Sequence, residues 1–399
     1  MVDDTDVVII GGGIGGLAAA AFLQQAGRKV RVFEQAPELK AVGAGIFVTP
    51  NAGRLIRRLG VMETFERSAV RLEEGWRFRR WSDGSVLFSQ ALGEDCRRLY
   101  GEYCYVAHRA DLLDSLRAVV DGDSIVLGKR CSHVEQSGDG VRVSFDDGST
   151  VTADVVIGAD GVRSAVARAV TDNPEPAFSH LAAYRSLIPA ADVPDFMRQP
   201  VHTVWLGPGR HFVHYPISGG KYINIVALVP ESEWQAESWS SQGNLDDFAA
   251  EFAGWDPHVS GLIGAAASVE HWALFDREPL GQWVKGSIAL LGDAAHPMYP
   301  FFAQGAAQAI EDAAVLGRCL ADESVDHETA LLNYQKARIA RATEVQMRSR
   351  ERAGSHHLPD GPEQRIRDEL FKNEDRFKHN AWLYAHDAEE SITPKGFSS

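Results

Sequence analysis

The chain has 399 residues and a net charge of −15 at pH 7, with 45% hydrophobic and 24% charged residues. This composition is that of a folded globular protein, and the length predicts two or three domains with a sizeable core. The acidic balance argues against nucleic acid as a partner.

The N-terminal residues and the cysteines indicate the compartment. The sequence MVDDTD is acidic where a signal peptide would be basic, and no apolar run is long enough to cross a membrane. The four cysteines show no CxxC spacing, which fits reduced thiols and argues against a zinc site or a disulfide scaffold. We therefore expect a cytoplasmic protein with no membrane partner and no bound metal.

The chain begins with the pattern of a β–α–β unit. Residues 6–10 (DVVII) are a short β-branched run, and residues 17–27 (LAAAAFLQQAG) are rich in helix formers and end in a glycine. The alternating residues 29–35 (KVRVFEQ) then predict a second strand.

The turn between this strand and helix carries a nucleotide-binding motif. Gly11, Gly13 and Gly16 give the spacing GxGxxG; the glycines permit the tight turn, the approach of a pyrophosphate and close helix–strand packing. The N-terminus of the helix would present N–H groups and its positive dipole end to the phosphates. Glu34 ends the next strand, where a carboxylate can accept hydrogen bonds from a ribose. The segment therefore predicts an adenine dinucleotide.

Hairpins follow in place of further β–α units. Asp-Gly pairs at 83–84 and 147–148 separate alternating runs. Residues 173–275 are rich in strand patterns, and residues 286–293 (GSIALLGD) return to an apolar strand before helical patterns. A nicotinamide dehydrogenase would continue with alternating strands and helices. The departure favours FAD, which stretches across its domain and contacts segments far apart in the sequence.

The predicted fold class is α/β. A Rossmann-like, doubly wound FAD-binding domain is accompanied by a β-rich substrate domain and a helical C-terminal part. The expected boundaries are 1–172 for the first part of the FAD domain, with a hairpin excursion near 74–90, 173–275 for the substrate domain, 276–345 for the second part of the FAD domain and 346–399 for a helical or tail segment. In the polar stretch after Ala353 we expect His356 and His357 to be solvated.

Three later segments place polar residues where a long cofactor needs them. Arg109 precedes a helical run, where a guanidinium can bind phosphate or ribityl oxygens. Asp160 and Asp293 each follow an apolar strand beside a glycine. The glycine would admit the cofactor chain, and the aspartate would bind a hydroxyl or cap the following helix.

Three motifs together resemble a known family. GGGIGG at 11–16 with Glu34, GADG at 158–161 and GDAAHP at 292–297 look like the fingerprints of single-component FAD-dependent aromatic hydroxylases, over about residues 6–345. The sequence is most similar to the branch with salicylate hydroxylase, 3-hydroxybenzoate 6-hydroxylase and 6-hydroxynicotinate 3-monooxygenase.

The resemblance implies an FAD-dependent monooxygenase. It would use NADH or NADPH and O₂ to hydroxylate a small phenolic or hydroxypyridine carboxylate through a flavin C4a-hydroperoxide, with or without decarboxylation, as a monomer or homodimer. A flavin oxidase or reductase on the same scaffold and a non-catalytic FAD-binding redox sensor are the alternatives.

The resemblance also assigns residues to FAD. Glu34 would bind the adenosine ribose, and Arg109 and Asp293 would contact the pyrophosphate and ribityl region. Asp160 would act indirectly and shape the path of the nicotinamide. Where the family often has Gly-x-Gly-x-Asn, this chain has residues 303–307 (AQGAA), so backbone N–H groups would hold the flavin's pyrimidine edge. The full expected set is Gly11, Gly13, Ile14, Gly15, Gly16, Glu34, Gly45, Ile46, Phe47, Arg109, Asp160, Asp293, Pro300, Gln304, Gly305 and Ala306.

A phenol is activated as its phenolate, so a base or relay near the substrate hydroxyl is expected. On a predicted hairpin that turns at residues 218–220 (SGG), His211 and Tyr215 share one face of the first strand and His214 lies on the other. His211 is the candidate base or relay and Tyr215 the candidate substrate contact, as the resemblance also implies; an exposed histidine and a packing tyrosine are the alternative. Further candidates for substrate binding are Tyr184, Arg185, His296 and Pro297; Arg185 could equally pair with a surface acid.

Overall fold

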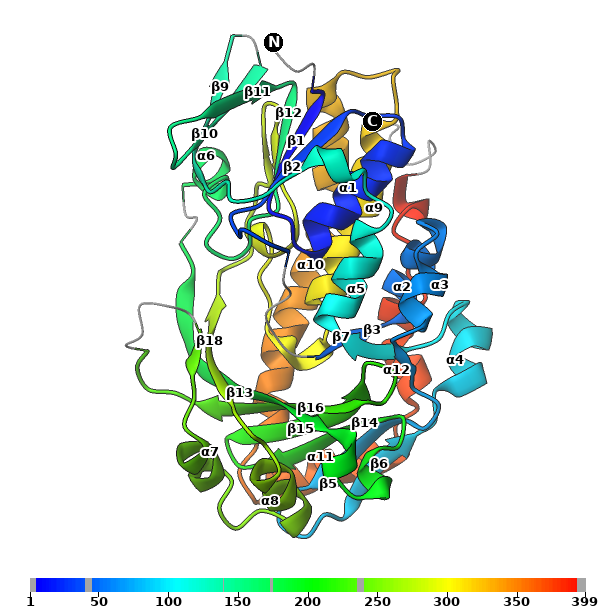
Figure 1. Cartoon of the computed structure of the whole chain (residues 1–399). Helices are drawn as coiled ribbons and strands as arrows, with labels where there is room; N and C mark the ends of the chain where they lie inside the picture. Colours follow the sequence, from blue (N-terminus) through cyan, green and yellow to red (C-terminus); the bar gives the residue numbers. More distant parts are fainter. Residues whose placement is uncertain (1–4, 40–44, 139, 173–174, 235–239, 393–399) are drawn as a thin grey trace.

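The computed structural model describes residues 5–39, 45–138, 140–172, 175–234 and 240–392. Two large sheets organise the chain, one around the N-terminal strand and one around the middle of the sequence (Figure 1). The expected α/β class with parallel strands is confirmed. No helix in the described ranges is long and apolar enough to span a bilayer.

The first sheet has six strands. In spatial order they are β19 (Val284–Lys285), β20 (Ile288–Leu290), β12 (Val155–Gly158), β1 (Val7–Ile10), β2 (Val30–Phe33) and β8 (Ile125–Val126). β1 pairs in parallel with both β2 and β12, and every residue of β1 is buried, as expected for a continuous apolar strand in a parallel sheet. α1 (Ile14–Gln25) and α9 (Gly305–Leu320) share the core with these strands. The expected β–α–β unit is confirmed.

The second sheet has eight strands. In spatial order they are β17 (Ser240–Gln242), β18 (Glu270–Asp276), β13 (Ala177–Pro189), β16 (Tyr222–Pro230), β15 (Arg210–Ile217), β14 (Val201–Gly207), β5 (Gly75–Arg80) and β6 (Val86–Gln90). The early hairpin β5–β6 joins this sheet through parallel pairing of β5 with β14. α7 (Leu245–Glu251) and α8 (Pro257–Gly264) pack on one face. The other face is therefore left to line a cavity.

Smaller elements complete the fold. Two three-stranded sheets are β11 (Thr150–Ala153), β10 (Gly140–Phe145) and β9 (Cys131–Ser137), and β3 (Gly45–Val48), β7 (Tyr105–His108) and β4 (Val70–Arg71). The remaining early helices are α2 (Pro50–Arg58), α3 (Met62–Glu66), α4 (Gly93–Tyr100), α5 (Arg109–Arg117) and α6 (Ala167–Val170). The expected hairpins β5–β6, β10–β11 and β15–β16 are all confirmed.

The C-terminal part is more ordered than the sequence suggests. α10 (His327–His356) runs from the first sheet to the second, and α11 (Pro362–Asn373) and α12 (Arg376–Tyr384) follow (Figure 1). The expectation that His356 and His357 are solvated is wrong. His356 ends α10 and is only 6% exposed, and His357 is partly buried. The end of α10 packs against the second sheet, where the His356 ring contacts Phe78 on β5 and His211 on β15.

Candidate active site

The expected cofactor residues converge where parallel strands end. β1, β2, β12 and β20 run in the same direction, so Gly11, Glu34, Asp160 and Asp293, which follow them, come to one edge of the sheet. Ligands of open α/β sheets bind at this carboxyl edge. Motifs that are far apart in the chain therefore meet at one site.

The glycine turn after β1 leaves no room for side chains. Gly11 has a φ of 108°, and a Cβ there would lie 2.3 Å from the carbonyl oxygen of Ala159. A Cβ on Gly16 would lie 1.9 Å from the carbonyl oxygen of Gly11. α1 begins at Ile14 with Gly13 as its N-cap and no side-chain cap. Its first N–H groups are therefore available to phosphate oxygens.

Glu34 is oriented by the backbone at the end of β2. Its Oε2 accepts a hydrogen bond from the Gly12 N–H at 2.7 Å, and its Oε1 accepts one from the Ala36 N–H at 2.8 Å. An ionised carboxylate has about four acceptor positions. It can keep both donors and still accept from the hydroxyls of a ribose.

Arg109 and Asp293 bring opposite charges to the same space. Burial lowers the pKa of the Arg109 guanidinium, and the charges of Asp293 and Glu34 oppose that shift. Asp293 lies deep in the protein, which raises the pKa of its carboxyl, although its side chain stays accessible because it faces a cavity. Together with the glycine turn and the uncapped N-terminus of α1, these two residues fit the polar chain of FAD.

Asp160 caps the segment that follows β12. Its carboxylate accepts hydrogen bonds from the Ser164 hydroxyl and from the backbone N–H groups of Ala165 and Val166. This is the capping role that a strand-ending aspartate can take without any ligand. A contribution of Asp160 to FAD binding would therefore act through the backbone that it orders.

His296 and Pro297 bind other residues of the protein. His296 is buried, packs against Trp283 and contacts Asp312, with Nε2 and Oδ2 at 2.5 Å. The carbonyl oxygen of Pro297 accepts a hydrogen bond from the side chain of Gln346 at 2.8 Å. Neither residue lines the cavity. The partner of His296 lies on α9, and the partner of Pro297 lies on α10.

The N-terminus of α9 borders the cavity through its backbone. The side chain of Gln304 points into the core, where Nε2 donates to Thr49 Oγ1 at 2.9 Å and Oε1 accepts from Asn51 at 3.1 Å. Ala303, in the stretch that departs from the family pattern, has a φ of 52°. This left-handed conformation costs a residue with a Cβ about 1–2 kcal/mol. Pro300, Gly305 and Ala306 line the cavity.

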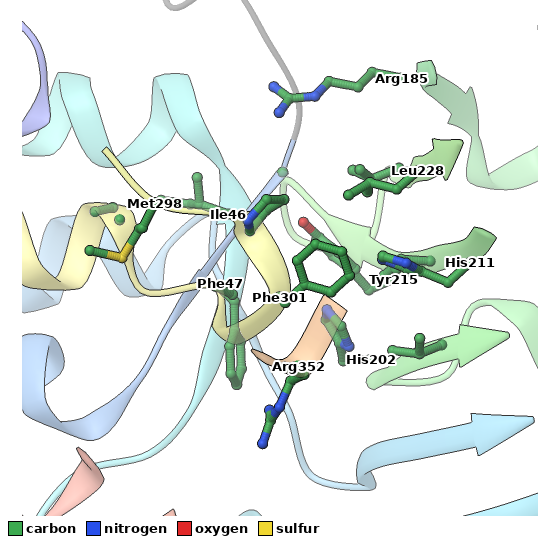
Figure 2. A pocket seen from close by; sticks show the side chains of 18 of the residues that line it. Ile46, Phe47, Arg185, His202, His211, Tyr215, Leu228, Met298, Phe301 and Arg352 are labelled. Carbon is green, nitrogen blue, oxygen red and sulfur yellow. The ribbon is translucent and has the colours of Figure 1, made fainter. Parts of the chain in front are cut away.

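The cavity lies between the strand ends of the first sheet and one face of the second, and its volume is about 310 Å³. Figure 2 shows Arg185 at one end and Arg352 at the other, with Tyr215 and His211 between them. The lining residues that the sequence predicted are Ile14, Gly45, Ile46, Phe47, Arg109, Arg185, His211, Tyr215, Asp293, Pro300, Gly305 and Ala306. This volume is at the lower end of the range for small-molecule sites.

His211 and Tyr215 face the cavity from β15, as the strand alternation predicts. Both are buried, at 5% and 4% exposure. The Tyr215 ring stacks on His202, with centroids 4.9 Å apart, and burial raises the pKa of its hydroxyl. A Cβ on Gly45 would lie 2.5 Å from the Tyr215 ring, so glycine is needed for this close approach. His214 lies on the other face, where its Nδ1 accepts a hydrogen bond from the Trp205 indole.

Arg185 and Tyr184 point to opposite faces of β13. The Arg185 guanidinium lies 4.6 Å from the centre of the Trp272 ring, and its buried Nε has no hydrogen-bond partner among the described residues. Burial lowers its pKa. Tyr184 instead stacks on His271 and Phe248, away from the cavity. Successive strand residues point to opposite faces, so of these two residues only Arg185 lines the cavity.

Several cavity residues were missed by sequence reasoning. Arg352 and His356 come from the end of α10, His202 from β14, and Phe301 from the turn before α9. None belongs to a local motif. The helical spacing of Arg352 and His356 would place them on one face of α10, but the polar composition around them gave no sign that this face was buried.

Comparisons with known proteins agree with this site. Residues 4–349 match the family model described as "FAD binding domain". The chain is 42% identical to a 3-amino-4-hydroxybenzoate 2-monooxygenase of Streptomyces platensis, over 96% of each chain. It is 36% identical to a 6-hydroxynicotinate 3-monooxygenase of Pseudomonas fluorescens, over 85% of this chain and 89% of the relative.

A solved structure extends the likeness to the fold. Klebsiella pneumoniae HpxO in complex with FAD and uric acid superimposes with a TM-score of 0.85 and 28% identity, over 99% of each chain. The predicted FAD cofactor and the predicted family are confirmed by these comparisons. The chain belongs to the family of flavoprotein aromatic-ring hydroxylases that share this FAD-binding domain.

Proposed function

We propose that this enzyme uses NADH or NADPH and O₂ to hydroxylate a small aromatic ring that carries both a hydroxyl and a carboxylate. In this proposal residues 1–172 and 276–345 hold the cofactor, and residues 173–275 supply most of the substrate side. FAD, when bound and reduced, supplies the oxygen-transfer chemistry. The protein positions the ring, excludes water and controls the proton of the ring hydroxyl.

The observation that carries the proposal is the unpaired Nε of Arg185 in the cavity that also holds His211 and Tyr215. A buried N–H donor without a partner costs about 1–3 kcal/mol, and the rest of the guanidinium borders the cavity. The Trp272 ring covers one face of the guanidinium but cannot satisfy its N–H donors. A substrate carboxylate would satisfy them in the two-pronged geometry that arginine favours.

His211 and Tyr215 suit the opposite, hydroxyl-bearing part of the substrate. Burial raises the pKa of Tyr215, so its hydroxyl stays neutral and can donate a hydrogen bond to the substrate oxygen. Burial lowers the pKa of His211, so its imidazole stays neutral and can accept a proton at Nε2. The ring between them would lie against Leu228 and Phe301, which keep water away from the reacting carbon.

The relatives support this substrate class. Their names specify an aminohydroxybenzoate and a hydroxynicotinate, each of which combines a ring hydroxyl with a carboxylate. The cavity of about 310 Å³ brings expected cofactor residues such as Arg109 and Asp293 together with Arg185 and His211, so ring and cofactor would share one site.

A substrate panel tests the proposal. The FAD-loaded enzyme is mixed with NADH or NADPH and with 3-amino-4-hydroxybenzoate, 6-hydroxynicotinate, 3-hydroxybenzoate or salicylate, and products are identified by mass spectrometry. We expect at least one compound to stimulate cofactor oxidation and to gain one oxygen atom. Hydrogen peroxide with unchanged aromatic compound in every case would favour a flavin oxidase and contradict the hydroxylase.

A further inference from the structure

A second histidine extends the candidate base away from the cavity. His211 Nδ1 lies 2.8 Å from Nε2 of His357, although the two residues are 146 positions apart in the chain. His357 directly follows α10, and its carbonyl oxygen accepts a hydrogen bond from the Gly209 N–H at 3.0 Å. This backbone contact fixes His357 against the start of β15.

The two rings lie at different depths. His211 is 5% exposed and lines the cavity, whereas His357 is only partly buried and does not line it. Because Nδ1 of His211 is used in the contact, its Nε2 is the nitrogen left for a substrate hydroxyl. The pair therefore connects the cavity with the surface through one hydrogen bond.

The surroundings keep both rings neutral. Burial lowers the pKa of His211, and His357 and His202 lower it further. Burial and the charge of Arg210 lower the pKa of His357 to about 4. The other titratable groups that border the cavity near His211 are Tyr215, His356, Arg185 and Arg352. None of these four is a carboxylate that could stabilise an imidazolium. An imidazolium at His211 would be unstable there, so His211 acting alone is a poor base for a phenol.

We propose that His357 is the outer member of a proton relay that carries the phenolic proton from the cavity to solvent. The inference rests on the proposed function, because it needs a phenolic ring at His211. Its geometry requires one shared proton in the 2.8 Å contact, which two neutral imidazoles of suitable tautomers supply.

The transfer balances without a charged histidine. The substrate O–H bond breaks and its proton binds His211 Nε2, while the Nδ1 proton of His211 passes to His357 Nε2. His357 then releases its own Nδ1 proton to water. Both rings end neutral in the opposite tautomer, the substrate is left as phenolate, and water carries the proton. The reverse sequence restores the tautomers after turnover.

The test replaces His357 with glutamine. A glutamine amide can still hydrogen-bond to His211, but it cannot accept one proton and release another. The FAD-loaded enzyme is mixed with 3-amino-4-hydroxybenzoate in a stopped-flow instrument, in weak buffer with a pH-indicator dye. We expect the wild type to release a proton on binding and His357→Gln to release it at least about 10-fold more slowly.

Chemical rescue separates a relay from a structural role. In His357→Ala, added imidazole should restore fast proton release, because it can occupy the space near the surface. His133→Gln is the control, because His133 is exposed on β9, and it should behave as the wild type. FAD content and thermal unfolding of each variant verify that it has folded.

The outcomes distinguish the two proposals. If the wild type hydroxylates a panel compound but His357→Gln releases the proton as fast as the wild type, or imidazole has no effect on His357→Ala, the relay is wrong and the hydroxylase stands. Binding of 3-amino-4-hydroxybenzoate to the wild type without proton release also overturns the relay. A wild type that hydroxylates no panel compound overturns both proposals.

Discussion

Replacing Arg185 with methionine removes the proposed carboxylate contact while keeping an unbranched side chain of similar length. A charge-assisted hydrogen bond contributes about 1.5–3 kcal/mol. Since 1.4 kcal/mol corresponds to a tenfold change in affinity, the dissociation constant for a carboxylate substrate should rise about 10- to 150-fold. The free enzyme should become more stable by about 1 kcal/mol, because the unpaired, buried Nε of Arg185 is removed.

A ligand change paired with the mutation isolates this contact. The dissociation constants of 3-amino-4-hydroxybenzoate and of the corresponding benzamide are measured from the flavin absorbance of wild type and Arg185→Met. The wild type should prefer the carboxylate strongly, and the variant should bind both ligands about equally. Arg79→Met is the matched control, because Arg79 also lies over a tryptophan, Trp205, but on the opposite face of the same sheet. An Arg185→Met variant that keeps the wild-type preference would refute the assignment.

Three further predictions concern the cofactor turn, the α9 turn and the buried histidines. Glu34→Ala should weaken FAD binding more than tenfold in a fluorescence titration, since a carboxylate held by two backbone N–H groups is lost; wild-type affinity would contradict the ribose role. Ala303→Gly should raise the free energy of unfolding by about 1 kcal/mol, because glycine adopts a φ of 52° without strain; a destabilised variant would contradict this. Burial lowers the pKa of His214 from 6.5 to about 3. Below pH 6.5 the unfolded chain therefore binds a proton that the folded chain does not, and the free energy of unfolding decreases as the pH is lowered. At pH 5 this amounts to about 2 kcal/mol. His214→Gln, which keeps an acceptor for Trp205, should therefore lose about 2 kcal/mol less than the wild type between pH 8 and pH 5; equal losses would contradict it.

Local patterns made part of the site predictable. The glycine turn can be recognised in the sequence because backbone geometry sets its spacing. A Cβ at Gly11 or Gly16 would collide with the backbone. The two-residue period of a strand placed His211 and Tyr215 on one face of β15. The same period places Tyr184 and Arg185 on opposite faces of their strand, so the sequence alone could have shown that only one of these two candidates faces the cavity.

The remaining residues depend on contacts between distant segments. His357 meets His211 only because α10 crosses from one sheet to the other, and a polar helix end gives no local sign of burial. His296 is drawn away from the cavity by Asp312, which also binds Arg338. Such buried polar networks override the rule that polar residues are exposed, and tertiary structure is needed to find them.

Isotope labelling tests the central claim most directly. Wild-type enzyme is supplied with FAD, NADH or NADPH, the compound of the panel that it consumes, and ¹⁸O₂ in unlabelled water. The proposed hydroxylation predicts that the aromatic product contains one ¹⁸O atom for each nicotinamide oxidised in coupled turnover. Product without ¹⁸O, or label recovered only in hydrogen peroxide and water, would contradict an aromatic hydroxylase.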